Sequence, residues 1–316
     1  MSRSSGNPIL GFRHDALFYA GVDSFVDRTV PFIRAGVRAE EPMLVVVAAE
    51  KIDRLRSELG SDAAKVRFED MAEVGLNPAR IIPVWRAFVD EHTASGGSVR
   101  GVGEPIWASR SADELVECER HEALLNLAIS EDTPLWLACP YDAGALSSSV
   151  LEEAQRNHPY LVDGGDRRAS DRFRGLEEIA EPFDHPLPEP VVRADELPFE
   201  LGDLRAVRAF TAREASAAGL SPDRTKDLVL AADEAAANSV SHGGGRGVLR
   251  IWMNEDSLVC EIRDSGRIDD PLAGRRRPTW SMRSGFGLWL MNQLCDLVQI
   301  RSFATGSVTR LHMSRR

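Results

Sequence analysis

The sequence contains few residues of several kinds that often carry function. Only three of its 316 residues are lysines (Lys51, Lys65 and Lys226), and none of them stands beside a glycine-rich loop. The Gly-x-x-x-x-Gly-Lys-Ser/Thr signature of P-loop proteins does not occur. A bound phosphate group would therefore have to be held by backbone amides, a metal ion or arginines rather than by a P-loop lysine.

Cysteine is scarce, and long apolar runs do not occur. The four cysteines are scattered singly, which indicates reduced thiols in a cytosol rather than a disulfide framework. No segment approaches the ~18 uninterrupted apolar residues of a membrane span, and the polar residues 1–8 have no signal-peptide core. We therefore expect a cytoplasmic protein that does not contact a membrane.

Charge is unevenly distributed along the chain. The net charge is −11, which makes the whole chain a poor partner for nucleic acid. Residues 201–316 carry 17 basic and 13 acidic residues, a net charge of +4, whereas the first 200 residues carry 21 and 36, a net charge of −15. A basic C-terminal part fits a phosphate ligand or an acidic partner, and equally fits ordinary surface variation.

A proline-rich acidic segment divides the chain. Residues 177–200 contain five prolines, which remove backbone donors and oppose helix formation. We therefore expect a domain at residues 1–175, a semi-extended linker at 176–200 and a second domain at 201–316.

The first domain shows alternating strand and helix patterns. Residues 43–49 are a continuous apolar run, typical of a strand buried on both faces. Residues 78–92 carry a helical apolar stripe, and residues 111–129 form a second long helix. A further strand at 135–139 is expected to end at Pro140. This alternation predicts an α/β domain with a mainly parallel sheet.

The second domain shows a different order of elements. Helices are expected at 203–218, 221–241 and 286–295, and hairpins at 248–263 and 298–313. Asp203 is a candidate N-cap for the first helix, and Ser221 followed by Pro222 is a strong start for the second. The order predicts an α+β domain whose antiparallel sheet is covered by helices on one face.

Four short segments of this domain have the chemistry of a nucleotide site. Glu234 and Asn238 share one helix face, where a carboxylate can orient a nucleophile and an amide oxygen can bind Mg²⁺. Asp264, followed by Ser265 and Gly266, comes directly after a strand, where its carboxylate can accept a hydrogen bond from an adenine amino group. Each of these short patterns also occurs on ordinary helix surfaces and turns.

The other two segments contain glycine. Gly285-Phe286-Gly287-Leu288 opens a helix, whose free backbone amides can hold phosphate. Gly306-Ser307 forms a turn between the last strands, where the hydroxyl could reach the base.

In their order and spacing, these segments resemble the GHKL (Bergerat-fold, histidine-kinase-like) ATPases, specifically the RsbW/SpoIIAB-type anti-sigma factor serine kinases. The resemblance covers roughly residues 199–316. It assigns Glu234 as the catalytic base and Asn238 as the Mg²⁺ ligand, Asp264 and Gly266 to the adenine box, and Gly285, Gly287 and Leu288 to the second glycine box. Ser307 stands where the family usually has threonine, and residues 270–275 resemble the lid of actinobacterial members.

This resemblance implies an enzyme that uses ATP and Mg²⁺ to phosphorylate a serine of an anti-anti-sigma (STAS-type) partner and that also sequesters a sigma factor. A homodimer is expected from the resemblance alone. Lid arginines at 275, 276, 277 and 283 could contact phosphate or form a solvated loop.

The first domain resembles the MEDS sensory domain, the DcmR-type sensor with a RecA/KaiC-like fold, over residues 12–174. The matching stretches are residues 14–19, 77–80, 100–107, 121–126 and 139–142. The resemblance implies a small-molecule ligand, for which hydrocarbon derivatives have been suggested.

Polar and aromatic residues near predicted strand ends form a candidate sensor pocket, because ligands favour such ends in α/β sheets. The members are Arg100, Glu104, Trp107, Arg110, His121, Glu122 and Tyr141. A buried structural network is the alternative interpretation. Cys118 and His121 have helical spacing that could share a metal ion, but no second pair with ligand spacing accompanies them.

Three other functions remain open. His121-Glu122 is similar to the phosphoacceptor box of sensor histidine kinases, although the usual Thr-Pro or Leu-Pro does not follow it. The ATPase domain could instead be a non-catalytic sequestering switch that needs ATP only for its shape. A transcription regulator is less well supported, because we find no helix-turn-helix pattern or basic recognition helix.

Overall fold

The computed structural model describes residues 9, 11–94, 96–163, 165–179, 185–278 and 285–315. The chain divides into two compact units, Met1–Ala180 and Glu181–Arg316. Within the described ranges, no helix combines the length and apolar character needed to cross a bilayer.

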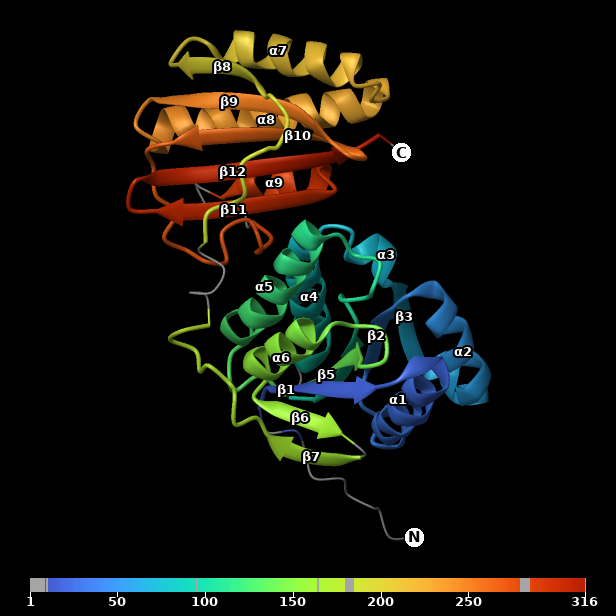
Figure 1. The fold of residues 1–316 in the computed structure, drawn as a ribbon. Helices are drawn as coiled ribbons and strands as arrows, with labels where there is room; N and C mark the ends of the chain where they lie inside the picture. Colours follow the sequence, from blue (N-terminus) through green and yellow to red (C-terminus); the bar gives the residue numbers. More distant parts are fainter. Residues whose placement is uncertain are drawn as a thin grey trace, which may run out of the picture. The chain divides into compact units, whose positions relative to one another are not determined.

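The N-terminal unit is built on a seven-stranded sheet with the order β3-β2-β4-β5-β1-β6-β7 (Figure 1). Its strands are β1 (Arg13–Tyr19), β2 (Met43–Val47), β3 (Val66–Asp70), β4 (Val99–Gly103), β5 (Leu135–Asp142), β6 (Tyr160–Asp163) and β7 (Asp166–Ala169). The described pairings are parallel except for β6 with β7. This confirms the predicted α/β architecture.

Helices lie against this sheet. They are α1 (Gly21–Arg38), α2 (Ala49–Leu59), α3 (Met71–Val74), α4 (Ile81–Thr93), α5 (Ala112–Ala128) and α6 (Ser148–Asn157), with 3₁₀ turns η1 (Gly60–Lys65) and η2 (Pro78–Arg80). Successive strand side chains face opposite sides. On β1, Leu17 and Tyr19 join the apolar cluster of α1 and α2, whereas His14 contacts α5.

Local predictions for this unit had different outcomes. The whole of β2 is buried, as its apolar run indicated, and Ser111 forms a capping box with Glu114 at the start of α5. The prediction that the strand ends at Pro140 was wrong, because β5 continues to Asp142. Pro140 pairs only with β1, since the pairing of β5 with β4 stops at Ala138. The missing N–H of Pro140 therefore interrupts no hydrogen-bond ladder on the β4 side.

The C-terminal unit has a five-stranded antiparallel sheet with helices on one face, as predicted (Figure 1). Its strands are β8 (Asp195–Glu200), β9 (Arg246–Asn254), β10 (Ser257–Asp264), β11 (Leu297–Phe303) and β12 (Gly306–Ser314), in the order β11-β12-β10-β9-β8. The helices are α7 (Leu204–Ala217), α8 (Pro222–His242) and α9 (Phe286–Leu294). Small residues of α8 such as Ala232 and Ala236 are buried against the sheet.

The two predicted caps of this unit behave differently. Ser221 caps α8, because its hydroxyl accepts a hydrogen bond from the backbone N–H of Arg224. Asp203 precedes α7 but does not cap it with its side chain, so that prediction was wrong. The Asp203 carboxylate instead accepts a hydrogen bond from the N–H of Glu200, which closes the turn after β8.

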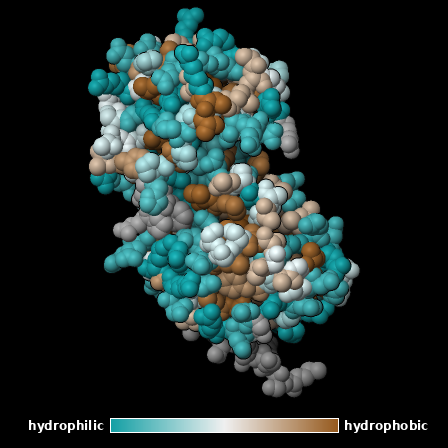
Figure 2. All heavy atoms as spheres, viewed as in Figure 1, coloured by the Kyte–Doolittle hydropathy of each residue, from teal (hydrophilic) through white to brown (hydrophobic). Residues whose placement is uncertain are grey.

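The segment expected to be a linker is partly built into the C-terminal unit. Residues 195–200 form β8, and the chain before them crosses the face of the sheet opposite the helices (Figure 1). Glu189 pairs with Arg250 and Arg263, while Arg310 donates to the carbonyl of Pro188. The free part of the linker is therefore shorter than residues 176–200. Hydrophilic side chains cover most of the face of this unit seen in Figure 2.

Candidate functional site

Asp264 forms the best-defined part of the candidate site. It ends β10, and its carboxylate accepts hydrogen bonds from Ser239 Oγ (2.6 Å), the N–H of Gly266 (2.8 Å) and Ser307 Oγ (2.9 Å). Two carboxylate oxygens offer about four acceptor positions. Three donors thus fix the orientation of Asp264 and leave room for one further donor.

Glycine is required at 266 because other groups approach it closely. A Cβ there would lie 2.7 Å from Gly243 Cα and 2.9 Å from the carbonyl oxygen of His242. The end of α8 and the loop after β10 are therefore held against each other.

Glu234 and Asn238 lie one turn apart on α8, facing the start of α9. A Cβ at Gly287 would lie 2.7 Å from Glu234 Oε2 and 3.3 Å from Asn238 Nδ2. Both side chains are partly exposed, so their polar groups can reach a ligand. The sequence spacing that placed them on one helix face is consistent with this geometry.

The start of α9 presents backbone amides. Gly285 is its N-cap, with φ +95°, a conformation that glycine adopts without strain. Glycine has no side-chain acceptor, so this residue does not cap the N–H groups of the first turn. Amides of this kind are a common binding site for phosphate.

These segments border one cavity of about 600 Å³, a size typical of small-molecule sites. Its lining includes Asn238, Asp264, Gly266, Gly285, Gly287, Leu288 and Ser307. Glu234 is not among the lining residues, although its carboxylate lies beside Gly287. Seven of the eight predicted site residues of this unit therefore meet at the cavity, and the eighth stands at its edge.

The predicted lid lies beside the same cavity. Leu272 and Gly274 contribute to the lining, and the carbonyl of Gly274 accepts a hydrogen bond from Asn292 of α9. Arg276 also lines the cavity and pairs with Asp270 at 3.1 Å. Arg275 is buried and Arg277 exposed, while Arg283 lies outside the described residues.

The seven residues predicted as a sensor pocket belong to several separate groups. Arg100 pairs with Glu41, and its guanidinium lies over the rings of Phe32 and Trp136. Arg110 stacks on Trp107 at 3.8 Å. These contacts place the two arginines in different environments, so they do not support a single pocket.

The remaining four predicted residues are buried. His121 and Glu122 are at most 1% exposed in α5, and Tyr141 packs its ring against His158. Cys118 donates its S–H to the carbonyl of Pro105, and burial raises the pKa of its thiol to about 12.

Glu104 has partners that the sequence analysis did not identify. Its carboxylate accepts hydrogen bonds from Lys51 Nζ at 2.7 Å, and Tyr19 OH donates to it as well. All three side chains are buried. Tyr19 ends β1 and Glu104 follows β4, so both stand at strand ends, a signal that the sequence offered. Nothing in the sequence linked Lys51 on α2 to them.

A cavity of about 530 Å³ lies in the N-terminal unit. Asp15, Phe32, Trp136 and Arg167 are among its lining residues, which include none of the seven predicted ones. Arg167 donates two hydrogen bonds to Asp15 and lies 3.6 Å from the ring centroid of Tyr160. This is a further candidate place for a small ligand of the sensor.

Glu119 on α5 predicts a pH-dependent stability. Burial, together with the nearby charge of Glu153, raises its pKa to about 7. Because this pKa lies above that of Glu119 in the unfolded chain, proton binding by Glu119 favours the folded state. This contribution to stability is complete below the unfolded pKa and is lost as pH rises through about 7. Glu119→Gln should therefore raise the free energy of unfolding by about 1–3 kcal/mol at pH 8, and by much less at pH 5. Urea unfolding at both pH values checks this, and equal effects at the two would contradict it.

Comparisons with known proteins identify both units. Residues 13–159 match the model of the MEDS domain, the methanogen/methylotroph, DcmR sensory domain, and residues 197–314 match the histidine kinase-like ATPase domain. The chain therefore combines a MEDS domain with a histidine kinase-like ATPase domain.

More distant comparisons add little detail. A solved structure of the RsbU and RsbW domains of a Mycobacterium tuberculosis protein matches at 19% identity with a TM-score of 0.29, covering 53% of this chain and 40% of that one. The chain thus spans less than half of that neighbour's length. No curated protein matches the sequence.

Proposed function

We propose that the C-terminal domain binds Mg-ATP in the 600 Å³ cavity and phosphorylates a serine of a partner protein, under control of the MEDS domain. The observation that carries this proposal is the meeting of four segments, far apart in the sequence, at one cavity. They come from α8, the end of β10, the start of α9 and the start of β12. The match to a histidine kinase-like ATPase domain supports it independently.

The residues present fit this ligand. Asp264 has an acceptor position left for an adenine amino group, and Ser307 holds it in place. The amides beside Gly285 and Gly287 suit phosphate, and the Asn238 amide oxygen is a hard ligand of the kind Mg²⁺ prefers. When bound, Mg²⁺ neutralises phosphate charge. Leu288 lines the same space.

Glu234 is the proposed general base. Its carboxylate stands at the edge of the cavity beside Gly287, and it can accept the proton of an attacking hydroxyl group. Phosphoryl transfer otherwise depends mainly on positioning and charge neutralisation. The chain therefore needs one well-placed base rather than a covalent nucleophile.

Serine is a better acceptor in this proposal than a histidine of the chain itself. His121, the only candidate similar to a phosphoacceptor box in the sequence, is 1% exposed within α5. A phosphoryl group could not reach it without unfolding of the helix. We therefore propose an anti-anti-sigma (STAS-type) protein as the substrate and a sigma factor as the second partner, as in the anti-sigma kinases that the sequence resembles.

Incubation of the full chain with γ-labelled ATP and a candidate STAS-type protein tests the enzymatic proposal. Acid hydrolysis should then release labelled phosphoserine from the partner. Nucleotide-dependent complex formation without any label transfer would favour the alternative, a non-catalytic sequestering switch. Label on histidine of this chain would instead overturn the serine assignment.

Gly287→Ala tests the contact between α9 and the base. Its methyl group would approach Glu234 Oε2 to 2.7 Å and must displace the carboxylate. Small displacements of catalytic groups can cost about 100-fold in rate, so we expect at least about a tenfold loss of transfer. Gly245→Ala, which strains a left-handed residue with open space around it, controls for lost stability. Equal activity in the two variants would contradict the prediction.

A further inference from the structure

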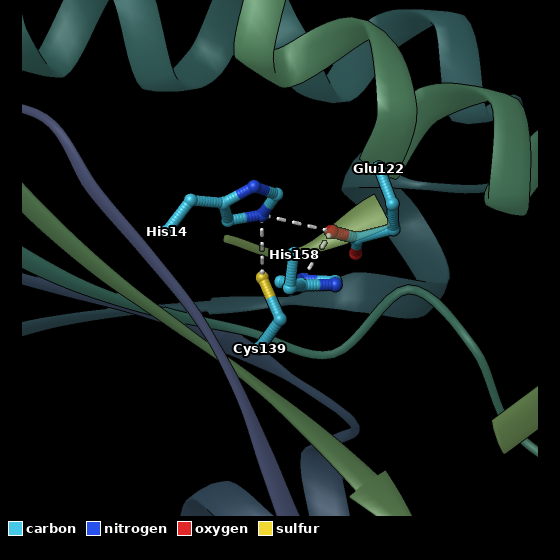
Figure 3. A group of neighbouring side chains, drawn as sticks. All are labelled: His14, Glu122, Cys139 and His158. Atoms are coloured by element: carbon cyan, nitrogen blue, oxygen red, sulfur yellow. Dashed lines mark hydrogen bonds and ion pairs between the residues drawn. The ribbon is translucent and has the colours of Figure 1, made fainter. Parts of the chain in front are cut away.

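Four potential metal ligands meet in the interior of the N-terminal unit. His14 comes from β1, Glu122 from α5, Cys139 from β5, and His158 directly follows α6. Figure 3 shows their side chains pointing toward one another, and all four residues are at most 1% exposed. One ligand atom of each lies within 4.8 Å of the others.

The distances within this cluster suit a tetrahedral ion. His14 Nε2 lies 3.1 Å from Glu122 Oε2 and 3.4 Å from Cys139 Sγ, and His158 Nε2 lies 3.3 Å from the same Glu122 oxygen. Zinc bonds of about 2.0–2.3 Å at tetrahedral angles separate neighbouring ligand atoms by about 3.3–3.6 Å. Small shifts would therefore bring the four atoms onto one ion.

The surrounding hydrogen bonds orient both imidazole rings. Asn126 Nδ2 donates to three backbone carbonyls, so its Oδ1 is the atom that faces His14 Nδ1 at 3.1 Å. His158 Nδ1 faces the carbonyl of Ala154 at 2.8 Å. Because both partners only accept, each Nδ1 carries a hydrogen, and the lone pair of each Nε2 points into the cluster. Outer partners of this kind are typical of metal-binding histidines.

With both rings neutral, Glu122 ionised and no metal ion, this arrangement is unfavourable. The lone pairs of both imidazole rings then lie near the carboxylate of Glu122, which only accepts, and the Cys139 thiol can donate only to that of His14. Glu122 Oε1 and His158 Nε2 are buried and lack a well-aligned hydrogen bond within the described residues. Protonating both rings would place two cations side by side, since the ring centroids of His14 and His158 are 4.1 Å apart.

We propose that His14, Glu122, Cys139 and His158 bind one divalent transition-metal ion, with zinc as the best fit. Two imidazole nitrogens, one thiolate sulfur and one carboxylate oxygen are donors that zinc accepts in tetrahedral sites. The two positive charges of the ion equal the negative charges of the thiolate and the carboxylate, so the buried site becomes neutral. Binding displaces the proton of the Cys139 thiol to solvent.

The site is closed rather than open to a substrate. The protein supplies four ligands, and none of them is more than 1% exposed. Closed four-coordinate sites are structural, whereas catalytic sites keep one position for water. The ion would therefore tie β1, β5, α5 and α6 together, and its loss would loosen the sensor domain.

Metal analysis of the full chain, purified under reducing conditions, tests the proposal. Mass spectrometry of the elements should find about one zinc per chain, or one after reconstitution of chelator-treated protein. Cobalt substitution should give the visible bands of a tetrahedral ion and a sulfur-to-cobalt charge-transfer band. Removing outer-shell partners alone weakens metal sites by about 10–100-fold, so Cys139→Ser should weaken binding at least tenfold and abolish the sulfur band.

Cys118→Ser is the matched control, because Cys118 is an equally buried thiol of the same unit that bonds Pro105 instead. It should retain the metal and the sulfur band. Folded wild-type protein that stays metal-free after reconstitution would overturn the proposal. So would equal metal content in wild type and Cys139→Ser. If Cys139→Ser does not fold, the presence or absence of the sulfur-to-cobalt band in wild type decides the question.

Discussion

Glu234→Gln should reduce phosphoryl transfer to a protein partner by about 10²–10⁴-fold, the usual contribution of a general base, with little change in the affinity for Mg-ATP. Glutamine keeps the shape of the side chain but cannot take up a proton from the attacking hydroxyl group. Single-turnover transfer assays and calorimetric titration with ATP measure the two quantities separately.

Asp233→Asn is the matched control for this variant. Asp233 is the neighbouring acid on α8, and its carboxylate pairs with Arg208 at 2.8 Å. It should therefore retain nearly full transfer activity. Wild-type transfer rates in Glu234→Gln, or an equal loss in both variants, would contradict the assignment of Glu234 as the base.

Lys51→Met should destabilise the N-terminal unit by about 3–5 kcal/mol, the cost of removing one partner of a buried ion pair. The Lys51 ammonium lies 2.7 Å from both oxygens of Glu104, and burial already raises the pKa of that carboxyl. Without the lysine, Glu104 would have to remain as an unpaired buried charge or bind a proton. Chemical unfolding at pH 8 measures the loss.

Lys65→Met is the control, because Lys65 is 65% exposed and its pair with Asp62 spans 3.8 Å. Exposed pairs of this kind contribute about 0–1 kcal/mol. Glu104→Gln added to Lys51→Met should restore part of the stability, since it removes the unpaired charge. A loss below about 1 kcal/mol in Lys51→Met would show that the buried pair does not stabilise the fold.

The candidate nucleotide site was largely predictable because each of its parts is short in sequence. Glu234 and Asn238 share a helix face through their spacing, and Asp264-Ser265-Gly266 follows directly after a strand. The order of these segments then indicated a known architecture. The structure has the sheet and the helices of that architecture. Their roles in binding and transfer remain proposals.

The interior of the sensor domain was not predictable in the same way. Parallel strands bring together residues far apart in sequence, and alternation sends neighbours to opposite faces. Asp15 thus pairs with Arg167 on one face of β1, while His14 meets Glu122 and Cys139 on the other. Spacing along one helix suggested Cys118 and His121 as metal ligands. Such spacing could not reveal the proposed site, whose four ligands come from different elements.

The linker shows a second kind of failure. Proline and acidic residues correctly opposed helix, but composition could not show that Glu189 meets two arginines of the sheet or that residues 195–200 pair with β9. Charge complementarity across a fold depends on positions that only the folded sheet defines.

Calorimetric titration of the full chain with Mg-ATP, in wild type and Asp264→Asn, tests the central claim most directly. The account predicts one nucleotide per wild-type chain. It also predicts about 10–100-fold weaker binding in Asp264→Asn, because hydrogen bonds to charged groups contribute about 1.5–3 kcal/mol. No uptake of nucleotide by folded wild-type protein, or equal affinity in the two proteins, would contradict the account.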